Sequence, residues 1–227
     1  MGVSHRIWGR VIRYDFGKLY TARRTGIPEG KIDIAVLASG SGTNLQALID
    51  TTDVASHIRM VVSDEAEAGA LARAADAGIE TAVVGWRDHP DRDRFSSAVA
   101  DLVEESGAKG VVLAGFMRVL SASFVERFPD RILNIHPSLL PSFPGMNAVQ
   151  NALEHGVKVT GVTIHFVDEM VDHGPVIAQR PVPVELDDTV ESLHARIQVE
   201  EHDLYPTVVR ALVQGDLTVD GRKVAWR

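Results

Sequence analysis

The stretch IDIAVLASGSGTNLQALID, from Ile32 to Asp50, predicts the fold class. Its first eight residues are mostly apolar and β-branched, which is typical of a strand buried on both faces of a parallel sheet. The strand ends at the turn GSGTN, and the apolar spacing of LQALID then indicates a helix. The stretch is therefore a strand–turn–helix unit.

The same alternation of strand and helix continues through most of the chain. Further strands are expected at 58–64, 80–86, 109–115 and 131–137, and helices at 65–77, 92–105, 121–128 and 148–155. Two strand-like runs at 159–167 and 174–184, a long amphipathic helix from 190 to 212 and a hairpin around Asp220-Gly221 follow. This order predicts an α/β, Rossmann-like fold with a mostly parallel sheet and helices on both faces.

The composition limits the class of protein. A chain of 227 residues with 45% hydrophobic residues is long enough for one α/β domain with a full core. No apolar run is long enough to span a bilayer. The sequence has no cysteine, which excludes disulfides, thiolate metal ligands and a cysteine nucleophile. This composition suits a reducing compartment, and we expect a cytoplasmic protein.

The charge is distributed unevenly. The net charge is −8, yet residues 1–31 carry seven basic and two acidic residues, so the rest is strongly acidic. An acidic body argues against nucleic acid as a partner. We expect residues 1–31 to be a basic, non-catalytic extension, with a targeting segment as the alternative, and residues 32–227 to be one domain.

The turn GSGTN, Gly40 to Asn44, is a candidate phosphate site. Glycines allow a ligand to approach the backbone, and the following helix start offers unpaired N–H groups to an anion. The dinucleotide fingerprint would require glycine at Leu45, and the Walker A pattern is absent. The turn is equally consistent with an ordinary connection between strand and helix.

Asn134 and His136, in LNIHPSLLPSFPG, are the candidate catalytic pair. They alternate on one strand, so they point to the same face, close to the carboxyl end where α/β sheets bind ligands. The loop DEMVDHG adds Asp168, Glu169 and Asp172. A carboxylate beside an imidazole favours the imidazolium, and an amide with an imidazolium can stabilise an oxyanion.

Three other interpretations of these residues stay open. His136 could be a hydrogen-bonded core histidine. His136, His165, Asp172 and His173 could hold a metal, although their spacing matches no strong zinc motif, and we expect none. A Ser-His-Asp hydrolase is disfavoured because the chain has no G-x-S-x-G elbow.

Five segments, in their order, resemble the glycinamide ribonucleotide transformylase family of folate-dependent formyltransferases. They are VLASGSGTNLQALI, LAGFMRVLSASFV, LNIHPSLLPSFPG, GVTIHFVDEMVDHGPVIAQ and RIQVEEHDLYP. The resemblance spans about residues 32–206. It implies a formyltransferase-type fold whose N-terminal half binds phosphate and whose C-terminal half binds folate and carries out catalysis.

The resemblance also implies which residues act. The catalytic residues would be Asn134, His136 and Asp172. The phosphate and ribose side of the substrate would contact Gly42, Thr43, Asn44, Gln198 and Glu201. The folate side would contact Arg92, Met117, Arg118, Val119, Leu120, Asn134, Asp168, Glu169, Met170, Val171 and Asp172. Asn147, Val149 and His173 depart from the residues common in the family.

The activity implied is direct transfer of the formyl group from 10-formyltetrahydrofolate to the amine of glycinamide ribonucleotide, without a metal. Asn134 and a protonated His136 would stabilise the oxyanion, and Asp172 would pair with His136. The protein would be a monomer or a homodimer. A 10-formyltetrahydrofolate deformylase, a methionyl-tRNA formyltransferase and a non-catalytic nucleotide-binding module are the alternatives.

Overall fold

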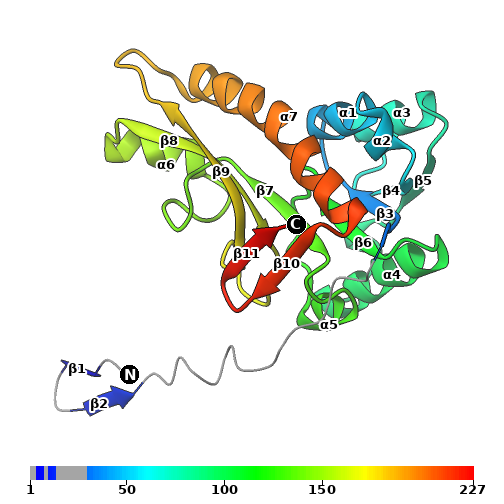
Figure 1. Ribbon diagram of the computed structural model, residues 1–227, viewed down its shortest axis with the longest axis horizontal. Helices are drawn as coiled ribbons and strands as arrows, with labels where there is room; N and C mark the ends of the chain where they lie inside the picture. The colour runs from blue at the N-terminus through cyan, green and yellow to red at the C-terminus, as the bar shows by residue number, and fades with distance from the viewer. Residues whose placement is uncertain (1–3, 8–9, 14–29) are drawn as a thin grey trace.

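The centre of the structure is a seven-stranded sheet with the strand order β5-β4-β3-β6-β7-β8-β9 (Figure 1). The computed structural model describes residues 4–7, 10–13 and 30–227. The strands are β3 (Ile34–Leu37), β4 (Ile58–Ser63), β5 (Glu80–Val83), β6 (Gly110–Leu113), β7 (Ile132–His136), β8 (Val159–Phe166) and β9 (Val176–Pro183). The first five strands in the spatial order are parallel to one another. Strand β8 pairs antiparallel with β7, and β9 pairs antiparallel with β8. The predicted mostly parallel sheet is confirmed.

Helices cover both faces of this sheet, as the sequence predicts. They are α1 (Thr43–Ile49), α2 (Thr52–Ala55), α3 (Gly69–Asp76), α4 (Arg92–Glu105), α5 (Ala122–Arg127), α6 (Ala148–His155) and α7 (Val190–Gln214). Strand β3 alternates between the two sides: Ile34 and Val36 belong to the core under α1 and α7, and Ala35 and Leu37 to the core under α4 and α5. A strand buried on both faces therefore explains its continuous apolar run.

Two short elements and one boundary differ from the prediction. The one-turn helix α2 and the 3-10 helix η1 (Trp86–Asp88) were not expected. Helix α3 begins at Gly69 rather than near residue 65. The Ser63 hydroxyl both donates to the Glu65 carbonyl and accepts from the Glu65 N–H, so a local turn replaces the first helical residues.

The N-terminal segment is described only in part. Strands β1 (Ser4–Ile7) and β2 (Arg10–Arg13) pair antiparallel with each other. The predicted role of residues 1–31 as an extension otherwise lies outside the described residues. Within the described part of the chain, no helix is both long enough and apolar enough to cross a membrane.

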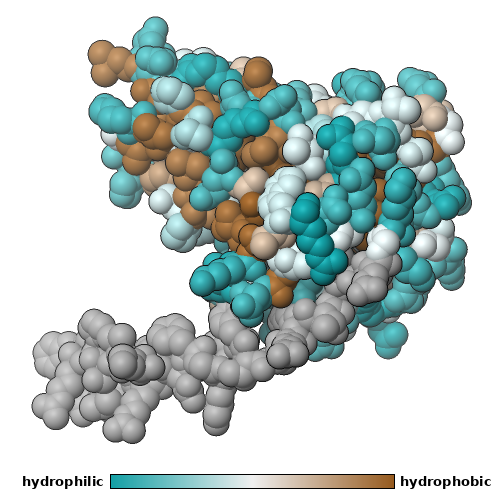
Figure 2. All heavy atoms as spheres, viewed as in Figure 1, coloured by the Kyte–Doolittle hydropathy of each residue, from teal (hydrophilic) through white to brown (hydrophobic). Residues whose placement is uncertain are grey.

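The chain ends in an antiparallel hairpin, β10 (Leu217–Asp220) with β11 (Lys223–Trp226), which confirms the predicted turn at Asp220-Gly221. In the view of Figure 2, hydrophobic residues gather mainly over the end of the molecule that β8, β9 and α6 form. Hydrophilic residues cover most of the rest of that view.

Helix α7 ties the sheet together through Tyr205. The helix starts at a capping box between Thr189 and Ser192 and ends at Gly215, which is left-handed with φ 75°. The fully buried Tyr205 hydroxyl donates to the carbonyl of Leu113 at 2.8 Å, with the Leu133 carbonyl 3.5 Å away. Burial, with the Glu201 charge, raises the pKa of Tyr205 well above its usual value, so the hydroxyl stays a donor.

We expect Tyr205→Phe to lower the free energy of unfolding by about 1 kcal/mol, because it leaves a buried carbonyl without this donor. The melting temperature should fall by about 2–4 °C. Thr207→Ala, at an exposed site two residues on, is the matched control and should stay within about 0.5 kcal/mol of the wild type. Equal stability of Tyr205→Phe and the wild type in urea denaturation would contradict this role.

Candidate active site

The glycine-rich turn joins β3 to α1 and requires glycine at position 42. Gly42 has φ 75°, and a Cβ at this position would lie 2.6 Å from the Cα of Ala70 in α3. Only glycine fits both the left-handed backbone and this close approach. The side chain of Asn44 donates to Glu201 at 2.9 Å, so the turn is tied directly to α7. Gln198 lies one turn before Glu201 on the same helix.

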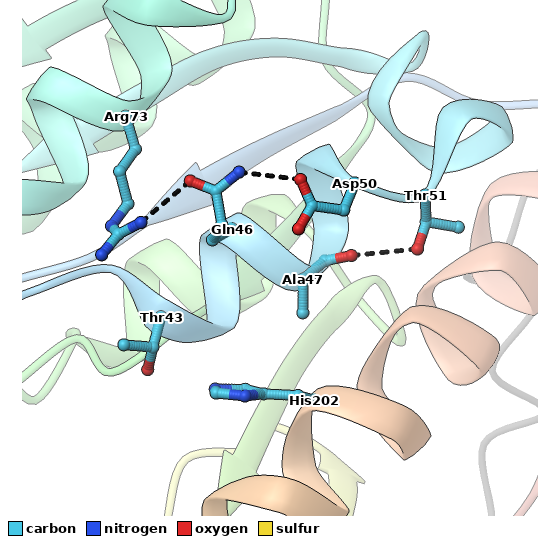
Figure 3. Close-up of a pocket in the computed structure, with 7 residues that line it drawn as sticks. All are labelled: Thr43, Gln46, Ala47, Asp50, Thr51, Arg73 and His202. Carbon is cyan, nitrogen blue, oxygen red and sulfur yellow. Dashed lines mark hydrogen bonds between the residues drawn. The ribbon is translucent and has the colours of Figure 1, made fainter.

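A cavity of about 480 Å³ borders this turn. Figure 3 shows the residues that line it: Thr43, Gln46, Ala47, Asp50, Thr51, Arg73 and His202. The Arg73 guanidinium donates to the Ser41 carbonyl at 2.8 Å and to the Gln46 side chain at 3.0 Å. A cation therefore holds the turn at the edge of the cavity.

His202 is a residue of this cavity that the sequence analysis did not single out. It extends from α7 toward the start of α1, opposite Thr43 (Figure 3). Its Nε2 atom is buried and has no hydrogen-bond partner within the described part of the chain. Buried polar atoms are nearly always satisfied, so this nitrogen is available to a group bound in the cavity. In the sequence, only its position next to the predicted site residue Glu201 could have indicated His202.

The three predicted catalytic side chains meet at the carboxyl end of β7. Asn134 and His136 project from the same face of the strand, and Asp172 comes from the loop between β8 and β9. Asn134 Nδ2 lies 3.3 Å from Asp172 Oδ1, and His136 Nδ1 lies 3.4 Å from Asp172 Oδ2. The trio of Asn134, His136 and Asp172 is therefore one connected cluster.

The loop after β7 closes over His136. The His136 Nε2 donates to the carbonyl of Phe143 at 2.9 Å, and Phe143 is left-handed with φ 53°. The N–H of Gly145 donates to Asp172 Oδ2 at 2.7 Å. Both ring nitrogens of His136 thus face an oxygen, an arrangement that the doubly protonated ring satisfies.

His165 is a fourth member of the cluster, which the sequence analysis considered only as a metal ligand. Its ring is buried on β8, where Nδ1 contacts the Phe166 carbonyl at 2.8 Å. Its Nε2 lies 3.2 Å from Asn134 Nδ2 and 3.6 Å from Asp172 Oδ1. The antiparallel register, with His165 opposite Asn134, causes this contact. That register was not apparent in the sequence.

Asp172 is ionised in this environment. Its side chain is only 9% exposed. Burial alone would raise the pKa of Asp172, but the hydrogen bonds from His165 and the Gly145 N–H, with the charges of His136 and His165, outweigh it. The pKa of Asp172 therefore lies below its usual value.

The predicted folate-binding segment 117–120 follows β6. Arg118 does not present its guanidinium to open space: it pairs with Asp64 at 2.6 Å and Glu65 at 2.9 Å and stacks over the Trp86 ring. The Ser39 hydroxyl accepts from the Met117 N–H at 2.8 Å. What this segment offers a ligand is therefore its backbone and its exposed apolar side chains.

The other predicted folate residues lie on the loop after β8 and on α4. Met170 and Val171 are more than half exposed, as are Met117 and Val119. Leu120 and Val167, which border the two segments, pack against the same core cluster. Arg92 is exposed in the first turn of α4, and within residues 30–227 no hydrogen bond or ion pair joins it to the trio.

The structure brings together three of the four candidate metal ligands, His136, His165 and Asp172, while His173 contacts Asp168 instead. In residues 30–227, no group of three or more histidine, aspartate and glutamate side chains is arranged to hold a metal ion. The His173 ring contacts Asp168 at 2.7 Å.

Comparison with known proteins finds similar proteins whose names refer to purine biosynthesis or to formyl transfer. The trifunctional purine biosynthetic protein adenosine-3 of Gallus gallus is 45% identical over 88% of this chain, which spans about a fifth of that relative's length. The phosphoribosylglycinamide formyltransferase of Escherichia coli is 40% identical over 86% of this chain and 93% of its own. A crystal structure of glycinamide ribonucleotide transformylase 1 from Symbiobacterium toebii has a TM-score of 0.83 and 47% identity, covering 86% of this chain and 94% of that chain.

The family assignment rests on a match that covers most of the chain. The sequence model of the formyl transferase family matches residues 32–209, which contain the glycine-rich turn, the trio and the cavity. The Symbiobacterium toebii structure shares the fold over 86% of this chain. This chain therefore belongs to the formyl transferase family.

Proposed function

We propose that this protein transfers the formyl group of 10-formyltetrahydrofolate to the primary amine of glycinamide ribonucleotide, in de novo purine biosynthesis. The observation that carries the proposal is the trio of Asn134, His136 and Asp172, gathered at the end of β7 in a formyl transferase fold. The names of the similar relatives support glycinamide ribonucleotide as the acceptor and formyl transfer as the reaction, and 10-formyltetrahydrofolate is the donor that the family resemblance implies.

The trio has the groups that this reaction needs. The amine nitrogen attacks the formyl carbon, the carbonyl oxygen becomes an oxyanion, and the bond from that carbon to folate N10 then breaks. Asn134 and His136 donate to the oxyanion. At His136 Nε2 the oxyanion would take the place of the Phe143 carbonyl, which accepts that hydrogen bond in this structure. The proton lost by the amine goes to N10, and the ionised Asp172 is the base that relays it. No covalent enzyme intermediate forms.

The glycine-rich turn and its cavity would hold the phosphate and ribose. Backbone N–H groups at Gly42 to Asn44 suit a phosphate, and the unpartnered His202 Nε2 supplies a donor beside them. Glu201 and Gln198 on α7 would contact the ribose and glycinamide side. Because Asn44 is bonded to Glu201, the two binding elements are already aligned.

The folate would lie between the segments 117–120 and 168–172. The exposed side chains of Met117, Val119, Met170 and Val171 give an apolar surface that fits a flat ring. Since the Arg118 guanidinium is held by Asp64, we assign the ring contacts to the backbone of Met117 to Leu120. Glu169 and Arg92, both exposed, would contact the outer part of the ligand.

We also propose that residues 32–227 act as one catalytic domain, as a monomer or homodimer in the cytoplasm. The phosphate elements come from β3, α1 and α7, and the trio from β7 and the β8–β9 loop. Both halves of the chain therefore contribute to one site.

The first test is folate turnover by the full chain, followed by absorbance, with and without glycinamide ribonucleotide. Turnover should require the ribonucleotide, and His136→Ala should lower kcat by about a hundredfold or more, because it removes an oxyanion donor. His194→Ala, on the exposed face of α7, is the matched control and should stay within about twofold.

The same assay separates the alternatives. Equal turnover without the ribonucleotide would make water the acceptor and the protein a deformylase. A wild type that binds the ribonucleotide but turns over neither mixture would be a nucleotide-binding module.

His202→Ala should raise the KM for glycinamide ribonucleotide about tenfold, because one charge-assisted hydrogen bond to the phosphate is lost. The KM for 10-formyltetrahydrofolate should stay within about twofold. Steady-state kinetics with each substrate varied in turn measures both values. A change confined to the folate KM would remove His202 from the phosphate site.

Asp172→Asn should flatten the acid dependence of stability. Because the pKa of Asp172 is lower in the folded than in the unfolded chain, the ionised carboxylate stabilises the fold at pH above the usual value of 3.8. This contribution is lost as the pH falls through the folded pKa. In urea denaturation at pH 7, 5 and 3, the stability of the wild type minus that of Asp172→Asn should therefore decrease only below about pH 4. A constant difference would contradict the lowered pKa.

A further inference from the structure

The C-terminal hairpin β10–β11 lies outside residues 32–209, which the family match covers, and the proposed reaction gives it no role. It is nonetheless firmly attached to the rest of the protein. Leu217 is 1% exposed, and Val219 and Val224 pack against the core under α7. The Arg227 N–H donates to the Asp216 carbonyl at 2.8 Å and closes the base of the hairpin. These contacts hold the base of the hairpin against the core and so determine where its tip lies.

The tip of the hairpin reaches the loop that carries Asp172. Figure 1 shows the hairpin beside β9, next to the lower turn between β8 and β9. At the tip, Arg222 Nη2 donates to the carbonyl of His173 at 2.8 Å, and Nη1 lies 3.4 Å from His173 Nε2. His173 directly follows Asp172 in the chain. The guanidinium therefore contacts both the backbone and the ring of one loop residue.

The His173 side chain also contacts Asp168, on the other side of the loop. Its Nδ1 contacts Asp168 Oδ2 at 2.7 Å, while Asp168 Oδ1 accepts the Met170 N–H at 3.0 Å. With Nε2 facing the Arg222 donor, Nδ1 carries the proton given to Asp168. Arg222, His173 and Asp168 thus form a chain of hydrogen bonds, which we name the hairpin latch.

The loop needs such support because its backbone is unusual on both sides of His173. Asp172 is left-handed with φ 50°, which a non-glycine residue adopts at a cost of about 1 kcal/mol. A Cβ at Gly174 would lie 1.8 Å from the Phe166 carbonyl oxygen, so the loop exit packs directly on the end of β8. Between these two positions, His173 offers the side chain that the hairpin can hold.

We propose that Arg222 is a positioning residue that keeps the 168–173 loop in its folate-binding conformation through the hairpin latch. The carboxylate of Asp172 has its own anchors, the Gly145 N–H and the two imidazoles. Loss of the latch therefore affects the binding surface of Met170 and Val171 more than the reacting groups. This assignment rests on the proposed function, because folate is its ligand.

The test compares Arg222→Ala, His173→Ala and their double variant with the wild type, using the full chain. Arg222→Ala should raise the KM for 10-formyltetrahydrofolate about five- to tenfold, while kcat and the KM for the ribonucleotide stay within about twofold to threefold. The double variant should be less impaired than the product of the single effects, because both act in one latch. Lys223→Ala, the neighbouring cation on the hairpin, is the matched control and should match the wild type.

A readout that does not depend on activity separates the latch from the proposed function. Hydrogen exchange of the amides at 168–174 should speed up several-fold in Arg222→Ala and not in Lys223→Ala, with a melting temperature within about 3 °C of the wild type. Faster exchange without any turnover by the wild type would leave the latch standing and overturn the proposed function. Three outcomes would overturn the latch. They are an unchanged folate KM in Arg222→Ala when the wild type is active, unchanged hydrogen exchange of the amides at 168–174, and effects of Lys223→Ala equal to those of Arg222→Ala. If the melting temperature of Arg222→Ala falls by more than about 3 °C, Arg222→Lys replaces it in the test. Arg222→Lys should then show a smaller rise in the KM for 10-formyltetrahydrofolate.

Discussion

The structure depends on one buried charge, the carboxylate of Asp172. A nearly enclosed carboxylate is tolerated only when donors surround it, and here they come from separate parts of the chain. Asn134 and His136 approach from β7, His165 from β8, and the Gly145 N–H from the loop that follows β7. The end of the sheet is therefore organised around this group, and two of its donors, Asn134 and His136, also form the proposed oxyanion site.

Helix α7 connects this charged site to the glycine-rich turn. Its successive turns carry Glu201, which accepts from Asn44, and Tyr205, which donates to the Leu113 carbonyl beside Asn134. Because both hydrogen bonds come from one helix, and the Tyr205 bond is buried, the fold sets the distance between the two binding elements. A transfer between two substrates benefits from such alignment, since positioning accounts for much of the rate gain.

The hairpin latch extends the same principle to the 168–173 loop on the other side of the site. A loop that must admit a ligand cannot be buried in the core, so its order comes from polar contacts at its edge. Arg222 supplies them from an element that is itself packed against the core.

The sequence by itself determined the fold class and paired Asn134 with His136, while the choice of Asp172 came from the family resemblance. The β-branched run before Gly40, the alternation of Asn134 and His136 and the position of Gly42 each follow from local chemistry. Local patterns do not record which strands become neighbours, and only the tertiary structure decided that. The antiparallel register of β7 and β8 brought His165 to Asn134, and the packing of α7 against α1 placed His202 at the cavity. Packing between distant segments likewise engaged the Arg118 guanidinium with Asp64 and Arg222 with His173, because long-range contacts leave no periodic signal in the sequence.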